Sequence, residues 1–588
     1  MSDTDVDDYV PLPAGLRKRF YEPVVLLRIL REFYRGCGRL SEPDLEGSQG
    51  KSLKETYFCF LNKLSQICDT HRKVPLGKTV SAITVLDRGT IEYRLASNQR
   101  DEGELKTVTE YLTRILRILG RLTDAEINDE KAKNAVFSEI LRMVLVFNRH
   151  RIEQYIEDLI SERQLDFCIQ YAESDKETNK GKSVAGALRS LQPDLEAAKN
   201  APRLDHTKFA LHTEMLLRKI NTHYGRVLEE YMKKKTPDPV SNPDSPWMEV
   251  RHALGRLLSY FIAVKVFISA RTLWPRLFVD FSVRSIPSSE PLENPPDIRR
   301  NVEGIIKRMT RDNSLMEAYK TNPAQIQTKD LNDRIRKRVQ SGNFTPIVHA
   351  EVNLLESVLA ERAEADGSGD GPLRFFHEAE FGAYIGTSKP TCMLCRFYFE
   401  AHPSGVLCRE SHGNIYHNWR APDVRRDDGP EPERLRRQIL EDMVKKVRQV
   451  TDQAIRQGRS LRKHYDSRDT PSNPLPTDKD YLSVNSRGVS RASDAASRTA
   501  AVDIEEVAAR TGQINLDNMS TRAWNDDDEA DSTETTSERS EPSTPTRHKR
   551  DYSQETTPAT PQSPIRAKRT KGNDEDDEDD DDGGGALL

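Results

Sequence analysis

Four residues in two short motifs have the types and spacing of a site that binds a metal ion and transfers protons. His349 and Glu351 form a His-x-Glu motif, and Cys392 and Cys395 are separated by two residues further along the chain. One imidazole and two thiolates leave the fourth tetrahedral position of a zinc ion open, which distinguishes a catalytic zinc site from a closed structural one. Such a zinc ion activates water. We therefore predict His349, Cys392 and Cys395 as zinc ligands, and Glu351 as a catalytic carboxylate that carries protons beside the metal.

The same cysteines also fit a different kind of zinc site. The run Cys392-x2-Cys395-x12-Cys408-x3-His412 has the spacing of a zinc finger, in which the metal is closed off by four ligands. A protein with that site would bind a partner without catalysing a reaction. This alternative leaves the His-x-Glu motif unexplained.

Both motifs are expected where helices begin. Apolar spacing predicts one helix from His349 and another from about Cys392. The positive end of a helix dipole favours a neutral imidazole and ionised thiols, which are the forms that bind a metal. Residues 375–386 read as one or two strands between these helices, and 435–454 as a last long helix. The basic residues of this last helix, which could bind a nucleic-acid backbone or form an ordinary charged outer face, are Arg436, Arg437, Lys445, Lys446, Arg448, Arg456, Arg459, Arg462 and Lys463.

The two motifs resemble those of the zinc-dependent nucleobase and nucleotide deaminases, the cytidine-deaminase-like superfamily. Residues 384–389 and 411–419, which flank the cysteines, are similar to a little-characterised deaminase-like family abundant in fungi. The resemblance covers about 340–425 and implies a three-layer α/β/α sandwich with the ligands and proton carrier named above. One position departs from the pattern. The superfamily usually has proline directly before the first cysteine, whereas this chain has Thr391 there and Pro390 one residue earlier.

The resemblance also suggests side chains that contact a substrate. In the superfamily the second strand often ends at an asparagine that faces the substrate, and Asn98 is in the matching place. Tyr416 and Trp419 could stack on a base, or could pack against the last strand. Lys389 could contact a phosphate, or could be a solvated lysine.

A β-hairpin is expected early in the chain, in residues 77–100. Val80–Leu86 and Ile91–Leu95 have strand patterns on either side of an Asp-Arg-Gly turn. The resemblance places such a hairpin in the deaminase sheet, before the His-x-Glu helix. The alternative is a hairpin packed on a separate helical domain. The expected regions are 1–76, N-terminal and helical; 77–100, the hairpin; 101–335, a large all-α insertion broken by proline-rich loops such as 286–296; 336–465, the zinc deaminase-like core with the basic helix; and 466–588, a disordered tail.

These features predict an α/β protein that hydrolytically deaminates a base in a nucleotide, a nucleoside or a nucleic acid. Its expected cofactor is Zn²⁺. The alternatives are an inactive deaminase fold that serves as a binding scaffold, and a zinc-finger-type binding module. A nucleobase-containing substrate is the expected partner, and a protein could bind the helical insertion or the tail.

Composition indicates a nuclear or cytosolic protein that is neither secreted nor inserted in a membrane. Seven scattered cysteines do not form a disulfide framework. The apolar run Leu257–Ala270 contains Lys265 and is shorter than the ~20 residues that cross a bilayer, so we expect a buried core helix. Basic clusters at 547–550 and 566–571 resemble a two-part nuclear import signal, or belong to a solvated tail.

Overall fold

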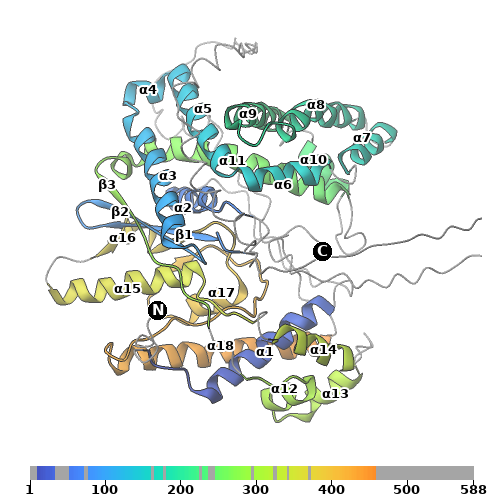
Figure 1. Cartoon of the computed structure of the whole chain (residues 1–588), viewed down its shortest axis with the longest axis vertical. Coiled ribbons are helices and arrows are strands. Elements are labelled where there is room, and N and C mark those ends of the chain that lie inside the picture. The colour runs from blue at the N-terminus through green and yellow to red at the C-terminus, as the bar shows by residue number, and fades with distance from the viewer. Residues whose placement is uncertain are drawn as a thin grey trace, which may run out of the picture.

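A mixed sheet lies at the centre of the protein, and helices cover both of its faces (Figure 1). Its strand order is β3-β2-β1-β5-β6, and β4 also pairs with β1. The α/β class predicted from the sequence is confirmed. This computed structural model describes residues 9–33, 52–71, 77–160, 164–175, 180–223, 228–235, 246–292, 297–321, 328–340, 344–368 and 373–457. The predicted tail with its basic clusters, and Arg459, Arg462 and Lys463, lie outside the described residues.

The elements largely follow the helical and strand patterns of the sequence. The strands are β1 Ser81–Asp87, β2 Ile91–Ser97, β3 Phe281–Ser285, β4 Arg374–Phe375, β5 Tyr384–Thr387 and β6 Leu407–Cys408. The helices are α1 Ala14–Phe33, α2 Leu53–Cys68, α3 Glu102–Arg121, α4 Asp124–Asn128, α5 Glu130–Phe147, α6 Arg149–Ile160, α7 Gln164–Ser174, α8 Gly181–Lys199, α9 His206–His223, α10 Leu228–Lys235, α11 Pro246–Leu273, α12 Val302–Met309, α13 Asn313–Thr321, α14 Thr328–Arg338, α15 Ala350–Ser368, α16 Glu378–Phe381, α17 Met393–Ala401 and α18 Pro430–Gln457.

The expected hairpin is present and belongs to the same sheet as the strand before Cys392. β1 and β2 pair antiparallel from Ser81↔Ser97 to Asp87↔Ile91. Gly89 in the turn has φ +93°, a conformation that glycine adopts without strain. On its other side β1 pairs antiparallel with β5, where Ile83 is opposite Gly386. Residues about 300 positions apart therefore form one sheet.

The segment expected to be all-α contains a strand, which corrects that part of the prediction. β3 pairs in parallel with β2 and extends the sheet at its edge, with Phe281 opposite Ile91. Its exposed polar residues alternate with half-buried residues over only five positions. A strand this short obtains its stability from its neighbour, so its local pattern was weak.

The two faces of the hairpin contribute to two different cores. Alternate strand residues point to opposite faces. Ile83, Val85 and Tyr93 pack in one core with helices α2, α3 and α11. Ala82, Leu86 and Ala96 pack in the other, which contains residues of α1, α15, α17 and α18. In Figure 1 these two helical groups lie above and below the sheet.

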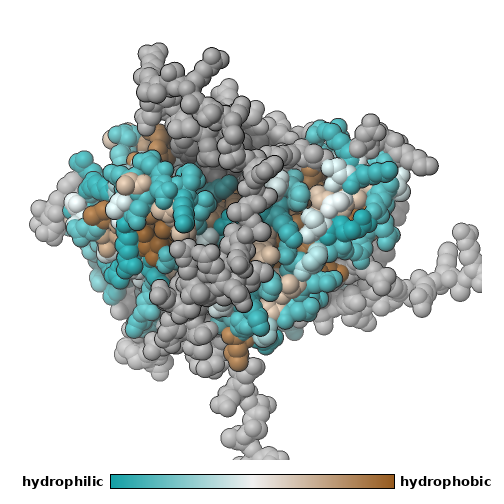
Figure 2. Space-filling view, turned by 90° about the horizontal axis from the view of Figure 1, so that it is seen from above, coloured by the Kyte–Doolittle hydropathy of each residue, from teal (hydrophilic) through white to brown (hydrophobic). Residues whose placement is uncertain are grey.

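Helix α11 contains the apolar run that raised the question of a membrane segment. The helix is longer than that run, and from Glu249 to Leu273 its length and composition would suffice to cross a bilayer. Burial decides the question, because 83% of its most apolar window lies inside the protein. On the face of the molecule seen from above, the described residues are largely hydrophilic, with hydrophobic residues in small groups (Figure 2). Helix α11 is therefore a core helix.

Helix α18 has the features of an ordinary amphipathic outer helix. Its apolar side packs against α1 and α17. Several of its basic residues form ion pairs with acidic neighbours, including Arg437 with Glu433 at 2.9 Å and Lys445 with Asp442 at 2.7 Å. Arg436 is buried and donates to the Val10 carbonyl. These pairings favour the charged outer face over a nucleic-acid surface.

Candidate metal centre

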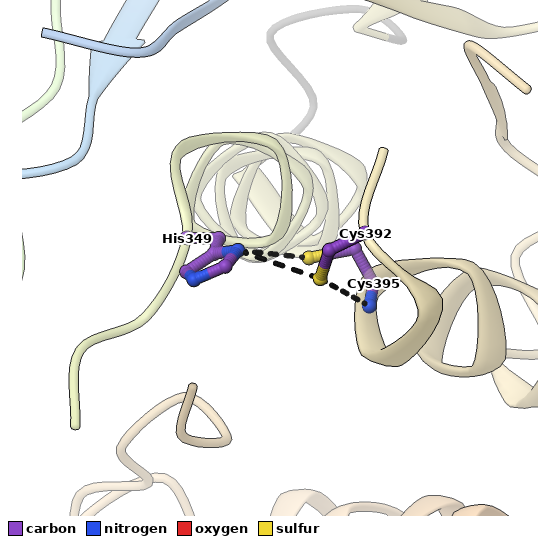
Figure 3. Close-up of side chains that lie close together, drawn as sticks. All are labelled: His349, Cys392 and Cys395. Atoms are coloured by element: carbon purple, nitrogen blue, oxygen red, sulfur yellow. Dashed lines mark hydrogen bonds between the residues drawn. The ribbon is translucent and has the colours of Figure 1, made fainter. Parts of the chain in front are cut away.

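The N-termini of two helices bring the predicted ligands together. His349 directly precedes α15, and Cys392 directly precedes α17. The Nδ1 atom of His349 lies 3.7 Å from Sγ of Cys392 and 3.4 Å from Sγ of Cys395 (Figure 3). All three ligand atoms lie within 4.8 Å of one another, the one such cluster in the described part of the chain. The structure therefore joins residues that are more than 40 positions apart.

The spacing of these atoms fits a zinc ion. Zinc binds nitrogen at about 2.0–2.1 Å and sulfur at about 2.3 Å, so tetrahedral ligands of these two kinds lie about 3.6 Å apart. The measured N–S separations are close to that value. Cys392 is also the N-cap of α17, and its Sγ accepts a hydrogen bond from the backbone N–H of Cys395 at 3.4 Å. A histidine with two cysteines is a typical zinc donor set.

Electrostatics favour one ionised thiol in the pair. Burial opposes ionisation of both sulfurs. A hydrogen bond with Cys395 and the charge of His349 nevertheless lower the pKa of Cys392 well below its usual value of 9.0. Burial and the neighbouring Cys392 hold the pKa of Cys395 well above that value. Since the thiolate is the ligating form, the site is prepared to bind a cation.

Glu351 lies in the first turn of α15, beside the three ligands. Its side chain is 4% exposed. Burial raises the pKa of this carboxyl above its usual 4.5, while the charge of His349 opposes the shift and Cys392 adds to it. A carboxyl in this environment retains a proton more readily than an exposed one.

Of the predicted substrate contacts, Asn98 and Tyr416 lie near the ligands. Asn98 Oδ1 accepts a 2.8 Å hydrogen bond from the backbone N–H of Ala350, the residue between His349 and Glu351. The ring of Tyr416 is half-buried, and its centroid lies 6.2 Å from that of His349.

Trp419 and Lys389 occupy positions that change their interpretation. Trp419 is 0% exposed and packs against Phe20 and Tyr398, so its position matches the packing alternative and leaves no face for a base. Lys389 is 8% exposed, so the solvated alternative is wrong. It lies near Asp69. Burial opposes ionisation of Asp69, but Arg151 and then Lys389 keep its pKa below the usual value. A phosphate contact by Lys389 stays a prediction.

Thr391 has a structural reason to replace the usual proline. Its backbone N–H donates to the carbonyl of Glu410 at 3.2 Å, and its carbonyl accepts from the N–H of His412 at 3.1 Å. Its hydroxyl donates to the Arg409 carbonyl at 2.9 Å. Proline has no N–H and could not make the first of these bonds. The bonds hold the loop after β6 against the segment that enters α17.

The zinc-finger alternative does not match the arrangement of the described residues. Cys408 and His412 are both described, and neither belongs to the cluster of close ligand atoms. Instead, Nδ1 of His412 accepts from the backbone N–H of Asn414 at 2.9 Å. Burial raises the pKa of the Cys408 thiol, as it does for Cys395, so the placement of Cys408 and His412 is what speaks against the closed site.

Two segments outside the sequence motifs hold the backbone of the site in place. Ser289, in an expected proline-rich loop, accepts from the N–H of Val348 at 2.8 Å and donates to the Val348 carbonyl at 3.1 Å. On the other side, Arg28 and Arg31 of α1 donate to the carbonyls of Ile415 and Gly413 in the loop that carries Tyr416. The sequence contains no local signal for these contacts, because each joins residues far apart in the chain.

A comparison with known families agrees with this geometry. Residues 348–423 match the family model described as OTT_1508-like deaminase. No curated protein and no solved structure is detectably similar to the chain. The matched segment contains His349, Glu351, Cys392 and Cys395. Residues 348–423 are thus a deaminase-like domain, and its His/Cys/Cys cluster fits a zinc site.

Proposed function

We propose that the chain is a zinc-dependent hydrolytic deaminase that acts on a nucleobase in a nucleotide, a nucleoside or a nucleic acid. One observation carries the proposal. His349, Cys392 and Cys395 meet at the N-termini of two helices, beside Glu351, inside a segment that matches a deaminase family model.

We infer that the central sheet, with helices on both faces, is the three-layer deaminase sandwich. The pairing of β1 with β5 supports this, because it joins the hairpin of 77–100 to the strand before the cysteine motif. In this view 336–465 is the core, and 101–335 is an insertion between β2 and α15. The strand β3 within that insertion extends the same sheet.

The proposed reaction replaces the exocyclic amino group of a base with oxygen. Water adds to the amidine carbon, the C–N bond breaks, and ammonia leaves. A zinc ion in this site supplies Lewis acidity that lowers the pKa of a water molecule to about 7. The Glu351 carboxylate accepts the proton that water loses and returns it to the departing nitrogen. Its burial supports this role, because the raised pKa favours the protonated, donating form.

Tyr416 is the residue we assign to the wall of the base pocket. Its ring is half-buried and lies beside His349 and His412, with centroids 6.2 and 5.8 Å away. An aromatic side chain can stack on any of the bases, because every base has a π-face. Its position, rather than an observed ligand, supports this assignment.

The test uses the purified full-length protein loaded with zinc and its Glu351→Gln variant. Ammonia release is measured with cytosine, adenine and guanine nucleosides and nucleotides, and with single-stranded RNA and DNA. We expect the variant to retain zinc while kcat/KM falls by about 10² to 10⁴, the usual contribution of a positioned acid or base.

Two results would contradict the proposal. The zinc-loaded protein could release no ammonia from any of these substrates, or the variant could be as active as the parent. The first result would favour an inactive fold that serves as a binding scaffold, and the second would show that Glu351 does not carry the proton.

A further inference from the structure

We propose that Asn98 is a positioning residue for the metal centre, which holds the peptide between His349 and Glu351 in place. The inference rests on the proposed zinc site and gives Asn98 a role other than contact with the substrate. It starts from the two hydrogen bonds of one side-chain amide.

Asn98 follows the last residue of β2, and the sheet fixes its backbone. Its N–H donates to the carbonyl of Val80 at 3.0 Å, one step beyond the ladder of the hairpin. The side chain is 6% exposed. Nδ2 donates to the Gly77 carbonyl at 2.9 Å, and Oδ1 accepts from the Ala350 N–H at 2.8 Å. Both ends of the amide are therefore bound to backbone groups of the protein.

The bond to Asn98 gives the first N–H group of α15 an acceptor that the helix itself cannot provide. The first N–H groups of a helix have no acceptor within the helix, and a side chain of the preceding residue often caps them. Here the preceding residue is His349, whose Nδ1 faces the two sulfurs. Since this imidazole is engaged in the ligand cluster, Asn98 caps the helix from the sheet.

The peptide N–H that Asn98 caps lies between two residues of the proposed site. Ala350 is the single residue between the histidine ligand and the proton carrier. A shift of its N–H would move both neighbouring side chains relative to the thiols of α17. Groups that orient metal ligands from outside typically change metal affinity or activity by about 10- to 100-fold when they are removed.

Two substitutions separate positioning from other roles. Asn98→Ala removes the acceptor, whereas Asn98→Asp keeps an oxygen that can accept from Ala350 and loses the donor to Gly77. We expect Asn98→Ala to weaken zinc binding by about 10- to 100-fold, and Asn98→Asp to restore most of the affinity. Zinc affinity is measured by competition with a chromophoric chelator, using the full chain.

Amide hydrogen exchange at Ala350 provides a readout that does not depend on activity. We expect this amide to be protected in the parent and in Asn98→Asp, and to exchange faster in Asn98→Ala. Where deamination is measurable, we expect Asn98→Ala to lower kcat more than it raises KM, because the reacting groups are displaced.

Asn148→Ala is the matched control. Asn148 is 0% exposed, and its Nδ2 donates to the carbonyls of Ile67 and Val144 at 3.0 Å, so it joins α5 to α2 in the helical half. We expect this substitution to lower thermal stability and leave zinc affinity unchanged. If loss of a buried asparagine weakened zinc binding only by destabilising the fold, Asn148→Ala and Asn98→Ala would both lower the zinc affinity.

The proposal is overturned if Asn98→Ala binds zinc like the parent and changes KM alone, which is the result expected of a substrate contact. If Asn98→Ala does not fold, Asn98→Asp decides: protection at Ala350 with zinc affinity near that of the parent supports the proposal, and a large loss of affinity refutes it. A parent protein that binds zinc but releases no ammonia refutes the deaminase function alone, because the zinc affinities still test Asn98.

Discussion

The sulfur and nitrogen atoms of the candidate metal centre are close enough to share one ion. His349 Nδ1 lies 3.4 and 3.7 Å from the two thiols, and helix N-termini hold both sides of the cluster. The residue types were evident from the sequence. Their separation had to come from the fold, because His349 and Cys395 are 46 positions apart.

At the scale of single residues, zinc content distinguishes the open site from a zinc finger. We expect His349→Ala to lose bound zinc, because it removes one of three ligands. Cys408→Ala should retain it, because Cys408 is outside the ligand cluster. Metal content of the purified variants is the measurement. Loss of zinc from the Cys408 variant with retention in the His349 variant would support the closed site.

At the scale of elements, α2 rests on β5 with no space for a side chain between them. A Cβ on Gly386 would lie 2.5 Å from the carbonyl carbon of Leu61 and 2.8 Å from the backbone nitrogen of Asn62. The close approach lets the Asn62 side chain bind Tyr384 and the N–H of Thr387. This contact docks the strand that leads to Cys392.

We therefore expect Gly386→Ala to lower the free energy of unfolding by about 1–3 kcal/mol, because two backbones must separate. Urea unfolding of the purified variant provides the measurement. Gly186→Ala in α8 is the control, because nothing lies within 4 Å of a Cβ there and alanine favours a helix. Equal stability of the two variants would show that α2 does not pack as tightly as described.

His71, which follows α2 in the chain, should make the stability of the protein depend on pH. Burial, with the charges of His150 and Arg100, lowers the pKa of His71 from 6.5 to about 4, while Asp69 and Glu104 oppose the shift. Between about pH 6.5 and pH 4, His71 is therefore protonated in the unfolded chain and neutral in the folded protein. Stability from this group is present above the unfolded pKa and is lost as pH falls from about 6.5 to about 4.

We expect His71→Gln to reduce that loss, because glutamine does not titrate. The measurement is the unfolding free energy of both proteins at pH 7 and pH 5. Other groups titrate in both proteins, so the comparison isolates His71. The prediction is wrong if acidification destabilises the variant as much as the parent.

At the scale of the whole molecule, the deaminase-like domain depends on strands far outside it. Within 348–423, β5 and β6 have four and two residues. The seven-residue strand β1 completes their sheet from the distant hairpin. Short strands without a partner are unstable in water.

A fragment of residues 344–457 should therefore fail to fold, because it lacks β1, β2 and α2. Circular dichroism and amide exchange of the purified fragment test this expectation. The chain 1–457 is the control, since it keeps every described pairing. A cooperative unfolding transition in the shorter fragment would show that the domain is independent of the hairpin.

The sequence by itself was sufficient for features that depend on neighbouring residues. It predicted the α/β class, the hairpin with its Asp-Arg-Gly turn, helices beginning at His349 and Cys392, and a ligand set that fits a zinc site. The hairpin and the helices follow from local spacing, because turns, caps and helical periodicity arise within a few residues. The α/β class and the ligand set followed from the residue types of the two motifs and from the deaminase resemblance that they carry.

Only the tertiary structure decided which distant residues meet. It joined β3 to β2, buried Trp419 and Lys389, and connected the Asn98 amide to the backbone between His349 and Glu351. Those outcomes depend on the packing of whole elements across hundreds of residues. No local pattern records them, because the same side chain can face solvent, core or ligand according to what the fold places opposite it.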